Sequence, residues 1–522
     1  MALTTERSHP PLPDALRAFH AQRPVWTPET DADGSRERAV IEVPRDYADP
    51  DGPRLTLALS RHRATDPDRR RGVLLSLNGG PGGDWGLGRR LADRFVGTAP
   101  HEVYDLVGFD PRGLGDSTRL YAEVTVPKAP FDSRPPDEDF ALIAEDMRLR
   151  ELGCLRGGGE LRPHISTRNI ARDLDVIRAV LGEERISYVG YAYGTSVGAA
   201  YATLFPERLD RSVLDSCVNP DWSWYEQFLS QGDAIRRNVD RWARWAGERH
   251  GRFGLGRTPD EVLGTVEDVA AQLERKAETP HLRTLLDGAM GYRTADRAQW
   301  EDLGDLIGTL RAATASDDLD RAKEALSGQR LWRPSDNEGE LRSGVLDAIT
   351  LEDDWPTDLE GYYATMRDYR TRYPYGYGVL RAQPWVGTFR TFTAPEPTVT
   401  VTGGDFPVGI VVQSEGDIMD HYAGGVAMAE RLGHHLITVA DSGEHEIYVL
   451  GANRRVDTLV DAYLTRGELP PARTTVAGAA PRPAVSPDAP DTPDAPDAPL
   501  TTDLPDLPGS PGLPAQIRST HP

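Results

Sequence analysis

Short buried-strand patterns alternate with amphipathic helix patterns over most of this 522-residue chain. Continuous apolar runs at residues 73–77 and 104–110 predict strands that are buried on both faces. Residues 167–181 carry apolar side chains at helical spacing, which predicts a helix that follows such strands. Strands that alternate with helices in this way indicate an α/β fold with a mostly parallel central sheet and helices on both faces.

The remaining patterns extend this sheet in both directions along the chain. Residues 38–44 and 54–60 alternate with period two around a turn, which predicts an antiparallel hairpin. Further strands are expected at 186–191, 211–218, 408–413 and 435–439, and further helices at 13–22, 423–432 and 454–464.

Four segments follow from these patterns. Between the strand at 211–218 and the strand at 408–413 the chain has long helical stretches without a buried-strand run, which predicts a helical cap inserted into the sheet domain. The Pro-Asp-Ala-Pro repeats near the end have few large apolar residues, which predicts disorder. The expected division is a lead at 1–35, a core at 36–218 and 394–468, a cap at 219–393 and a tail at 469–522.

A glycine-flanked turn lies at the centre of the predicted sheet. The strand at 186–191 runs into Gly190-Tyr191-Ala192-Tyr193-Gly194 and then into a helix of small residues. This is the strand-to-helix bend of a nucleophile elbow, G-x-S-x-G, but its middle residue is Ala192 instead of serine. Either a serine was replaced deliberately or the natural chain has abandoned serine catalysis. Ser196 lies in a second G-x-S-x-G frame one helical turn further on, where a small packing residue is the simpler interpretation.

Three loops at strand ends accompany this elbow. The strand at 73–77 leads into the glycine-rich loop 78–83, whose backbone N–H groups can approach a ligand. Asp417 follows the strand at 408–413, and His445 follows the last strand. The order of nucleophile position, acid and histidine along the chain is that of α/β-hydrolases.

Charge and cysteine content restrict the partners and the compartment. The formal net charge of −23 argues against nucleic-acid or anionic-membrane binding. It favours a cationic or amine-bearing ligand, but it is explained equally well by acidity that keeps the protein soluble. Two cysteines are too few for a disulfide framework, and neither an apolar signal region nor a run long enough to span a membrane occurs in the sequence. A cytoplasmic protein is therefore expected, whereas its oligomeric state is left open.

Taken together, these stretches resemble the proline iminopeptidase and tripeptidyl aminopeptidase family of α/β-hydrolases, from about Arg38 to Arg466. The matching stretches are Asn78-Gly-Gly-Pro-Gly-Gly83, Tyr104-Asp-Leu-Val-Gly-Phe-Asp-Pro-Arg-Gly113, Ala171-Arg-Asp-Leu-Asp-Val-Ile-Arg178, Gly190-Tyr-Ala-Tyr-Gly-Thr195 and Trp224-Tyr-Glu226. The resemblance implies an α/β-hydrolase fold with a helical cap, a small-molecule or short-peptide substrate, and neither metal nor cofactor.

The resemblance also implies roles for particular residues. Ala192 stands at the nucleophile position, Asp417 at that of the acid and His445 at that of the base. The N–H groups of Gly80 and Tyr193 stand where the oxyanion hole is. The residues expected to bind substrate are Trp85, Trp224, Tyr225 and Glu226, where Glu226 would bind the free amine of the substrate. The cap is also expected to bring Tyr375 toward the pocket.

Three departures from the family pattern surround this site. Ala192 is the first. The second is that Glu444 and Glu446 flank His445 where the family usually has glycines, and the third is Asp84 after the glycine loop where a serine is common. Carboxylates near His445 would raise the pKa of its imidazole if they point inward.

Three functions stay open on this basis. The first is a serine-type exopeptidase or amidase that lacks its serine and acts on a peptide, amide or ester. The second is a non-hydrolytic biosynthetic enzyme that uses Asp417 and His445 as a general base pair. The third is a catalytically dead binding protein.

Overall fold

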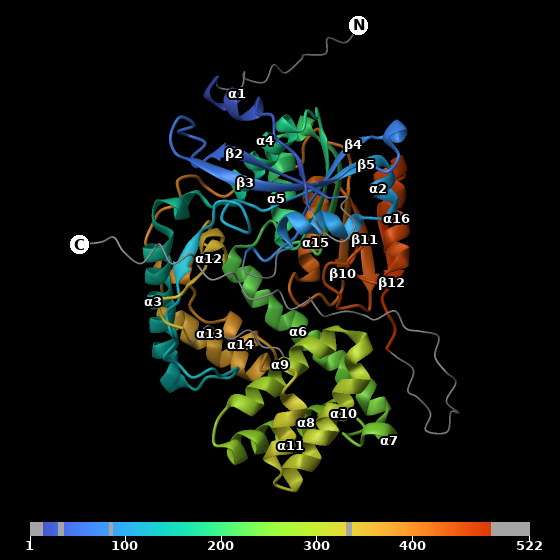
Figure 1. Ribbon diagram of the computed structural model, residues 1–522. Coiled ribbons are helices and arrows are strands. Elements are labelled where there is room, and N and C mark those ends of the chain that lie inside the picture. Colours follow the sequence, from blue (N-terminus) through green and yellow to red (C-terminus); the bar gives the residue numbers. More distant parts are fainter. Residues whose placement is uncertain (1–13, 30–35, 83–86, 330–336, 482–522) are drawn as a thin grey trace, which may run out of the picture. The chain divides into compact units, whose positions relative to one another are not determined.

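The computed structural model describes residues 14–29, 36–82, 87–329 and 337–481. Its largest sheet has ten strands in the order β1-β2-β3-β5-β4-β7-β8-β10-β11-β12 (Figure 1). They are β1 (Thr27–Pro28), β2 (Glu37–Pro44), β3 (Arg54–His62), β4 (Gly72–Leu77), β5 (Tyr104–Phe109), β7 (Ile186–Tyr191), β8 (Leu209–Asp215), β10 (Ile410–Ser414), β11 (His435–Ala440) and β12 (Arg473–Ala477). The pairs β1–β2, β2–β3 and β3–β5 are antiparallel, and every pair from β5 across to β12 is parallel. The expected α/β fold with a mostly parallel sheet is confirmed.

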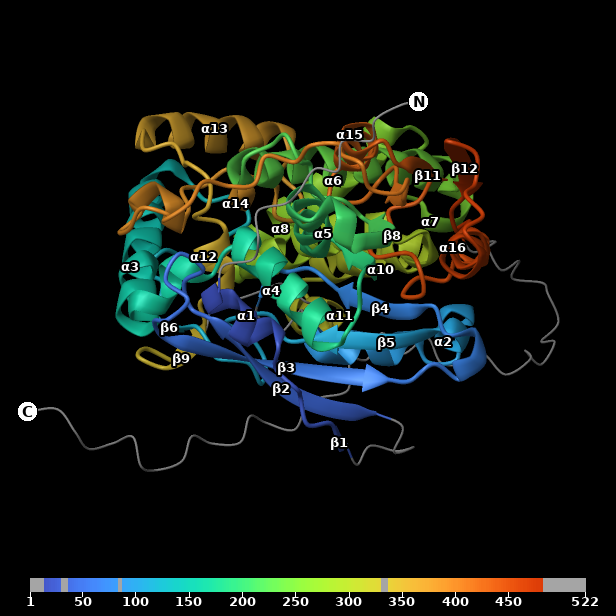
Figure 2. The same ribbon diagram turned by 90° about the horizontal axis from the view of Figure 1, so that it is seen from above.

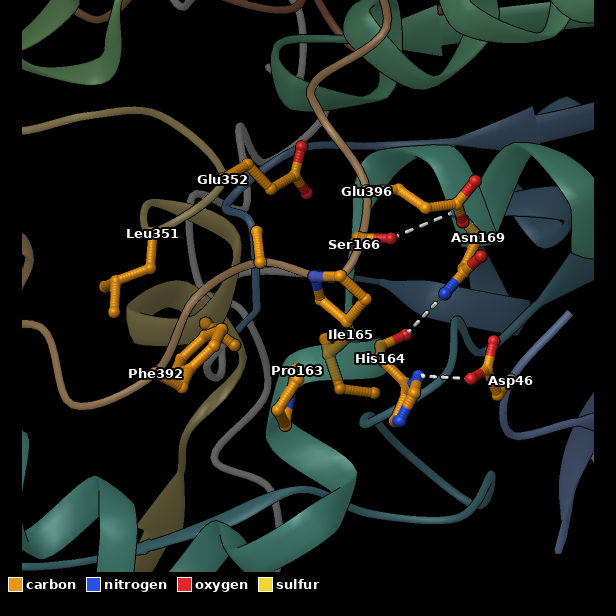
Figure 3. Close-up of a pocket in the computed structure, with 13 residues that line it drawn as sticks. Asp46, Pro163, His164, Ile165, Ser166, Asn169, Leu351, Glu352, Phe392 and Glu396 are labelled. Carbon is orange, nitrogen blue, oxygen red and sulfur yellow. Dashed lines mark hydrogen bonds and ion pairs between the residues drawn. The ribbon is translucent and has the colours of Figure 1, made fainter. Parts of the chain in front are cut away.

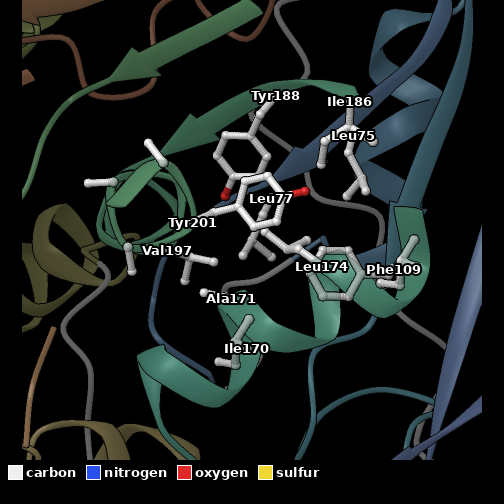
Figure 4. Packing of buried hydrophobic residues seen from close by; sticks show 14 of the residues in the cluster. Leu75, Leu77, Phe109, Ile170, Ala171, Leu174, Ile186, Tyr188, Val197 and Tyr201 are labelled. Carbon is white, nitrogen blue, oxygen red and sulfur yellow. The ribbon is translucent and has the colours of Figure 1, made fainter. Parts of the chain in front are cut away.

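Helices cover both faces of this sheet because side chains of the buried strands alternate between two cores. In β4, Leu75 and Leu77 join one core and Leu74 joins the other. The first core, drawn in Figure 4, contains Leu174 and Val197 from two helices that follow sheet strands. The covering helices of the first face are α4 (Thr167–Val180), α5 (Tyr193–Leu204) and α15 (Tyr422–Leu432), and those of the second are α2 (Ala99–Val103), η3 (Gly88–Phe95) and α16 (Arg454–Arg466).

Shorter elements complete the sheet domain. Helix α1 (Asp14–His20) packs on α4 and β2 (Figure 2). Helix α3 (Phe140–Gly158) connects β5 to α4. The short 3-10 helices described in this domain are η1 (Pro67–Arg69), η4 (Asp137–Asp139), η5 (Gly159–His164) and η6 (Pro206–Arg208), whereas η7 (Arg297–Gln299) and η8 (Val386–Phe389) lie between β8 and β10.

The segment between β8 and β10 is mainly helical and is called the helical insertion below. Its helices are α6 (Trp224–Glu248), α7 (His250–Phe253), α8 (Pro259–Ala277), α9 (His281–Ala295), α10 (Trp300–Ala315), α11 (Leu319–Leu326), α12 (Val345–Ile349), α13 (Leu359–Arg372) and α14 (Gly378–Arg381). Val239 and Trp242 on α6 pack against α8, α9 and α10 in a hydrophobic core that is separate from the two cores of the sheet. Among the described residues of this insertion, one strand lies between the helices: β9 (Leu341–Ser343), which pairs with β6 (Tyr121–Glu123).

Two segment boundaries drawn from the sequence need correction. Residues 473–477 were assigned to the tail, but they form β12, whose backbone pairs with β11 and whose Val476 is buried. Residues 27–28 were assigned to the lead, but they form β1 at the opposite edge of the sheet. Both strands are short and mostly exposed, so neither leaves an apolar pattern in the sequence.

Candidate active site

The turn between β7 and α5 has a strained backbone at Ala192. Ala192 has φ 48° and ψ −122°, a conformation that L-residues rarely adopt and that costs about 1–3 kcal/mol. Its N–H donates to the carbonyl oxygen of Asp215 at 3.0 Å, and its own carbonyl accepts the N–H and the hydroxyl of Thr195. The turn therefore keeps an elbow geometry, although the side chain at its tip is a methyl group.

Close approaches of the backbone explain the glycines on both sides of the elbow. A Cβ at Gly190 would lie 2.6 Å from the carbonyl oxygen of Gly194, and a Cβ at Gly194 would collide with the carbonyl oxygen of Leu77. The Tyr188 hydroxyl donates to the Gly194 carbonyl at 2.7 Å. Helix α5 thus begins directly against the ends of β4 and β7, and larger residues would push it away.

The glycine-rich loop after β4 lies against the first residue of α5. A Cβ at Gly79 would collide with the methyl group of Ala192 and lie 2.8 Å from the backbone nitrogen of Tyr193. Gly80 has φ 144°, which favours glycine. The fold therefore brings the Gly79–Gly80 loop beside the start of α5, where the sequence placed the two oxyanion donors, Gly80 and Tyr193.

Asp417 and His445 are in direct contact. The Nδ1 atom of His445 lies 2.9 Å from Oδ2 of Asp417. The other Asp417 oxygen accepts the backbone N–H groups of Met419 and Asp420 at 2.8 and 3.1 Å, which fixes the carboxylate. Asp417 is fully buried, whereas the His445 side chain is 26% exposed. The expected pairing of acid and histidine is present; that His445 also faces the Ala192 methyl group stays a prediction.

Asp215, at the end of β8, anchors both the elbow and the histidine loop. Its carbonyl oxygen accepts the Ala192 N–H. Its buried carboxylate accepts the N–H groups of Ile447 and Tyr448 at 3.0 and 2.7 Å and the hydroxyl of Ser216 at 2.9 Å. Sequence reasoning missed Asp215, because nothing in its own strand distinguishes it from other polar strand ends.

Carboxylates surround His445 and raise the pKa of its imidazole. Burial opposes the charged form of His445, but Asp417, Asp420 and Glu446 outweigh it and raise its pKa to about 10. Burial raises the pKa of Asp420 to about 7, and burial also raises the pKa of Glu446. Asp420 lies 4.0 Å from His445 Nδ1 and accepts the side-chain amide of Gln227 at 2.7 Å. The sequence singled out neither Asp420 nor Gln227.

The two glutamates beside His445 have different surroundings. The carboxylate of Glu444 accepts the hydroxyl of Ser442 at 3.3 Å within the same loop. The backbone N–H of Glu446 donates to the Ser216 hydroxyl at 2.9 Å, and its carboxylate, unlike that of Glu444, is among the groups that raise the pKa of His445. The inward orientation considered from the sequence therefore applies to Glu446.

Of the residues expected to bind substrate, Trp224 reaches the elbow. Its ring centroid is 6.2 Å from that of Tyr193. Tyr225, the next residue on α6, packs against Trp355 and Tyr362 inside the helical insertion. Trp85 lies outside the described residues, as does Asp84.

Glu226 and two other candidates have structural roles. Glu226 is exposed and forms a capping box with Ser223, whose N–H donates to its carboxylate at 2.8 Å at the start of α6. Tyr375, expected near the pocket, is 3% exposed in the core of the helical insertion. Ser196 lies half-buried within α5, one turn beyond the elbow, as a helix residue.

A cavity of about 20 Å³ lies at the start of α4 and is lined by none of the expected site residues (Figure 3). Ser166 caps α4 there, and the neighbouring Thr167 N–H donates to the Glu352 carboxylate. The Thr167 hydroxyl lies 2.9 Å from the Tyr193 hydroxyl, which connects the start of α4 to the start of α5. Burial raises the pKa of Glu352 to about 8. A volume of this size holds about one water molecule.

The described ranges contain neither a metal cluster nor a membrane span. No three His, Cys, Asp or Glu side chains in those ranges are placed to hold a metal ion. No helix in the same ranges combines the length and the apolar character that crossing a membrane requires.

Comparison with known proteins gives several matches that extend over most of the chain. A family model described as the alpha/beta hydrolase fold matches residues 72–452. A tripeptidyl aminopeptidase of Streptomyces lividans is 32% identical over 466 residues, which cover 85% of this chain and 84% of that protein. The serine protease Hip1 of Mycobacterium tuberculosis is 30% identical over 489 residues, which cover 85% and 89%. The structure of a proline iminopeptidase-related protein from Thermus thermophilus covers 83% of this chain and 99% of its own, with 17% identity and a TM-score of 0.35.

Proposed function

Because this chain belongs to the α/β-hydrolase family, among serine-hydrolase-type peptidases related to tripeptidyl aminopeptidase, we propose that its site binds a short peptide, or an amide or ester of a small molecule, above Ala192. The observation that carries this proposal is the strained backbone of Ala192, with φ 48°. Such strain persists only where the surrounding structure imposes it, and it clusters at functional sites.

The remaining groups fit the roles that the family implies. Asp417 would fix the tautomer of His445, and His445 would exchange a proton with the ligand. The N–H groups of Gly80 and Tyr193 would stabilise negative charge on a carbonyl oxygen. Trp224, beside Tyr193, would line the entrance from the helical insertion, which we propose acts as the cap over this site.

The methyl group of Ala192 limits the reactions that this site can catalyse. Without a hydroxyl at the elbow no acyl-enzyme can form there, and loss of a triad nucleophile costs roughly a millionfold in turnover. We therefore expect the chain as written to show no measurable acyl transfer, whatever it binds.

Restoration of the hydroxyl tests this proposal. Ala192→Ser should be labelled by a fluorophosphonate and should hydrolyse aminoacyl or tripeptidyl arylamides at some pH between about 6 and 10. The matched control is Ala192→Ser combined with Ser196→Ala, which should keep the labelling, because Ser196 is a helix residue. No labelling at any pH, in a variant that is folded by circular dichroism, would contradict the proposal.

A second candidate is favoured by the carboxylates around His445. A histidine with a pKa of about 10 is protonated at neutral pH and is a poor base for a serine, but it can donate a proton in a non-hydrolytic step. Turnover of a metabolite by the alanine protein, lost in His445→Ala, would establish this candidate. Ligand binding without turnover in either form would leave a binding role.

The compartment stays a prediction. Cys154 and Cys217 are buried free thiols, which suits a reducing cytoplasm.

A further inference from the structure

One face of helix α6 lies along residues 415–421, the loop that contains Asp417 and is called the acid loop below. Three buried side-chain amides of α6 donate hydrogen bonds to this loop: Gln227 to Oδ1 of Asp420 at 2.7 Å, Gln231 to the carbonyl oxygen of Met419 at 2.9 Å, and Asn238 to the carbonyl oxygen of Gly416 at 2.6 Å. Positions 227, 231 and 238 share one face of a helix. The helical insertion and the acid loop are therefore held together along the length of the loop.

The buried carboxylate of Asp420 lies between this helix and His445. Its Oδ1 atom accepts the Gln227 amide, and its Oδ2 atom lies 4.0 Å from Nδ1 of His445. Asp417 contacts the same ring nitrogen at 2.9 Å. One nitrogen of His445 therefore faces two carboxylates, of which Asp417 is hydrogen-bonded and Asp420 acts through its charge at a longer distance.

Backbone contacts fix the two carboxylates relative to each other. The N–H of Asp420 donates to Oδ1 of Asp417 at 3.1 Å, and the carbonyl oxygen of Asp420 accepts the side-chain amide of Gln413 at 2.9 Å. In the described part of the chain, Gln227 alone donates a hydrogen bond to the carboxylate of Asp420. The main chain of Asp420 is thus held by the end of β10, whereas its side chain is held by α6.

The other titratable groups nearby provide no further counter-charge for these carboxylates. The ion pairs that Asp417 and Asp420 form with described residues are both with His445. The remaining groups are Asp215 and Cys217 at the end of β8, Glu444 and Glu446 beside His445, and the ion pair of His421 with Asp233 between the acid loop and α6. Buried carboxylates without a counter-charge are costly, so both carboxylates favour a proton on His445.

We propose that Asp420 is a second acidic partner of His445 and that Gln227 holds it in place, so that helix α6 helps to set the protonation of the histidine. Both are positioning residues, because they act through His445. In an exchange with a ligand above Ala192, the proton moves between Nε2 of His445 and a ligand atom, and the charge of Asp420 stabilises the imidazolium side of this exchange. The location of the ligand rests on the proposed function.

The pKa directions agree with this arrangement. Burial lowers the pKa of His445, but Asp417 and then Asp420 outweigh it and raise the pKa to about 10. Burial raises the pKa of Asp420 to about 7, and the charge of His445 opposes this shift. Between these two values the pair is a carboxylate beside an imidazolium.

The first experiment titrates the histidine in the chain as written. Protein labelled with ¹³C at histidine Cε1 is followed by NMR, and the His445 resonance is assigned by its loss in His445→Gln. We expect Asp420→Asn to lower the midpoint of His445 by about one pH unit or more, because a charge about 4 Å away is removed. Asparagine keeps an oxygen for the Gln227 amide, so this variant should fold.

The matched control for that titration is Asp233→Asn. It removes a carboxylate of the same helix that pairs with His421, so it should shift the His445 midpoint by less than about 0.3. A midpoint that Asp420→Asn leaves unchanged, or a control shift as large as that of Asp420→Asn, would overturn the inference.

Gln227→Met tests the link to α6 in the same titration. Methionine has a similar size but no donor, and a buried carboxylate without a donor favours its neutral form, so the His445 midpoint should fall by about half a pH unit or more. Combined with Asp420→Asn, it should give the midpoint of Asp420→Asn alone to within about 0.2, because Gln227 acts through Asp420. A further fall in the double variant, or no shift in Gln227→Met, would refute the role of Gln227.

The last experiment separates this inference from the proposed function. The rate of fluorophosphonate labelling is measured from about pH 6 to 10 in Ala192→Ser and in Ala192→Ser combined with Asp420→Asn. Attack by serine needs a neutral imidazole, so the pH profile of the double variant should lie about one unit or more lower. Identical profiles would refute the role of Asp420 and leave the proposed function standing. Absence of labelling in both would contradict the proposed function, and the NMR midpoints would still decide the roles of Asp420 and Gln227.

Discussion

Replacement of Asp215 by alanine should destabilise the protein more than most single substitutions, because one buried carboxylate accepts two backbone N–H groups. Tyr448 N lies 2.7 Å and Ile447 N lies 3.0 Å from its Oδ2 atom, and the Ser216 hydroxyl lies 2.9 Å from Oδ1. A buried donor left without a partner costs about 1–3 kcal/mol. Loss of the acceptor of both N–H groups should therefore lower the free energy of unfolding by about 2–6 kcal/mol. The hydroxyl of Ser216 adds little, because it can rotate to another acceptor.

Comparison with Asp215→Asn separates the loss of the hydrogen-bond acceptor from the loss of the negative charge, because asparagine keeps an oxygen acceptor. An asparagine oxygen can accept both N–H groups, and its amide can donate to Ser216, so we expect a loss below about 1 kcal/mol. Burial raises the pKa of Asp215 to about 7, so at pH 6 the native carboxyl is mostly neutral and the comparison is close to isosteric. The assay is guanidinium unfolding at pH 6, followed by near-UV circular dichroism. A loss below about 1 kcal/mol in Asp215→Ala, or equal losses in the two variants, would refute the reasoning.

Three other predictions follow from contacts already described. Gly79→Ala should lower the free energy of unfolding by about 1–3 kcal/mol in a thermal assay, because the new Cβ would lie 2.8 Å from Tyr193 N. As a control, Gly264→Ala should be neutral or stabilising by up to about 1 kcal/mol, because no atom lies within 4 Å of a Cβ at that position. Folding raises the pKa of His445 from 6.5 to about 10, so the protonated histidine stabilises the folded protein fully below pH 6.5, and this stabilisation is lost as the pH rises through 10. Relative to His445→Gln, the free energy of unfolding should therefore fall by up to about 5 kcal/mol between pH 6 and 10. Glu226→Ala should lower the free energy of unfolding by about 0.5–1 kcal/mol through loss of the capping box, and a larger loss in the same thermal assay would mean that Glu226 has partners beyond Ser223.

The parts of the site that the sequence predicted are those fixed by local chain geometry. The elbow was recognisable because a buried strand ends in glycine and a small-residue helix follows at once, and backbone crowding requires that pattern around Ala192. Asp417 and His445 were recognisable because each follows a buried strand, and the ends of parallel strands meet at one edge of a sheet. The fold followed from the same periodicity.

The parts that the sequence could not predict depend on contacts between distant segments. Asp420 lies three residues after Asp417, and its contacts with His445 and Gln227 join two loops and a helix that no local pattern relates. Glu226 has the residue type for binding an amine, but its position three residues after Ser223 gives it a capping role. Tyr375 is aromatic like Trp224, and only tertiary packing separates a core residue from one beside the elbow.

Strand β12 has a consequence for handling the protein. It covers the outer edge of β11, a strand of sequence His-Leu-Ile-Thr-Val-Ala with four buried residues. The outer side of β12 is short and polar, and four of its five residues have exposed or half-exposed side chains. A chain cut after Arg466, where the last helix ends, would leave the β11 edge bare, and a bare apolar edge strand is a template for pairing between molecules. Such a truncation would aggregate, whereas one made after residue 481 would keep the edge covered.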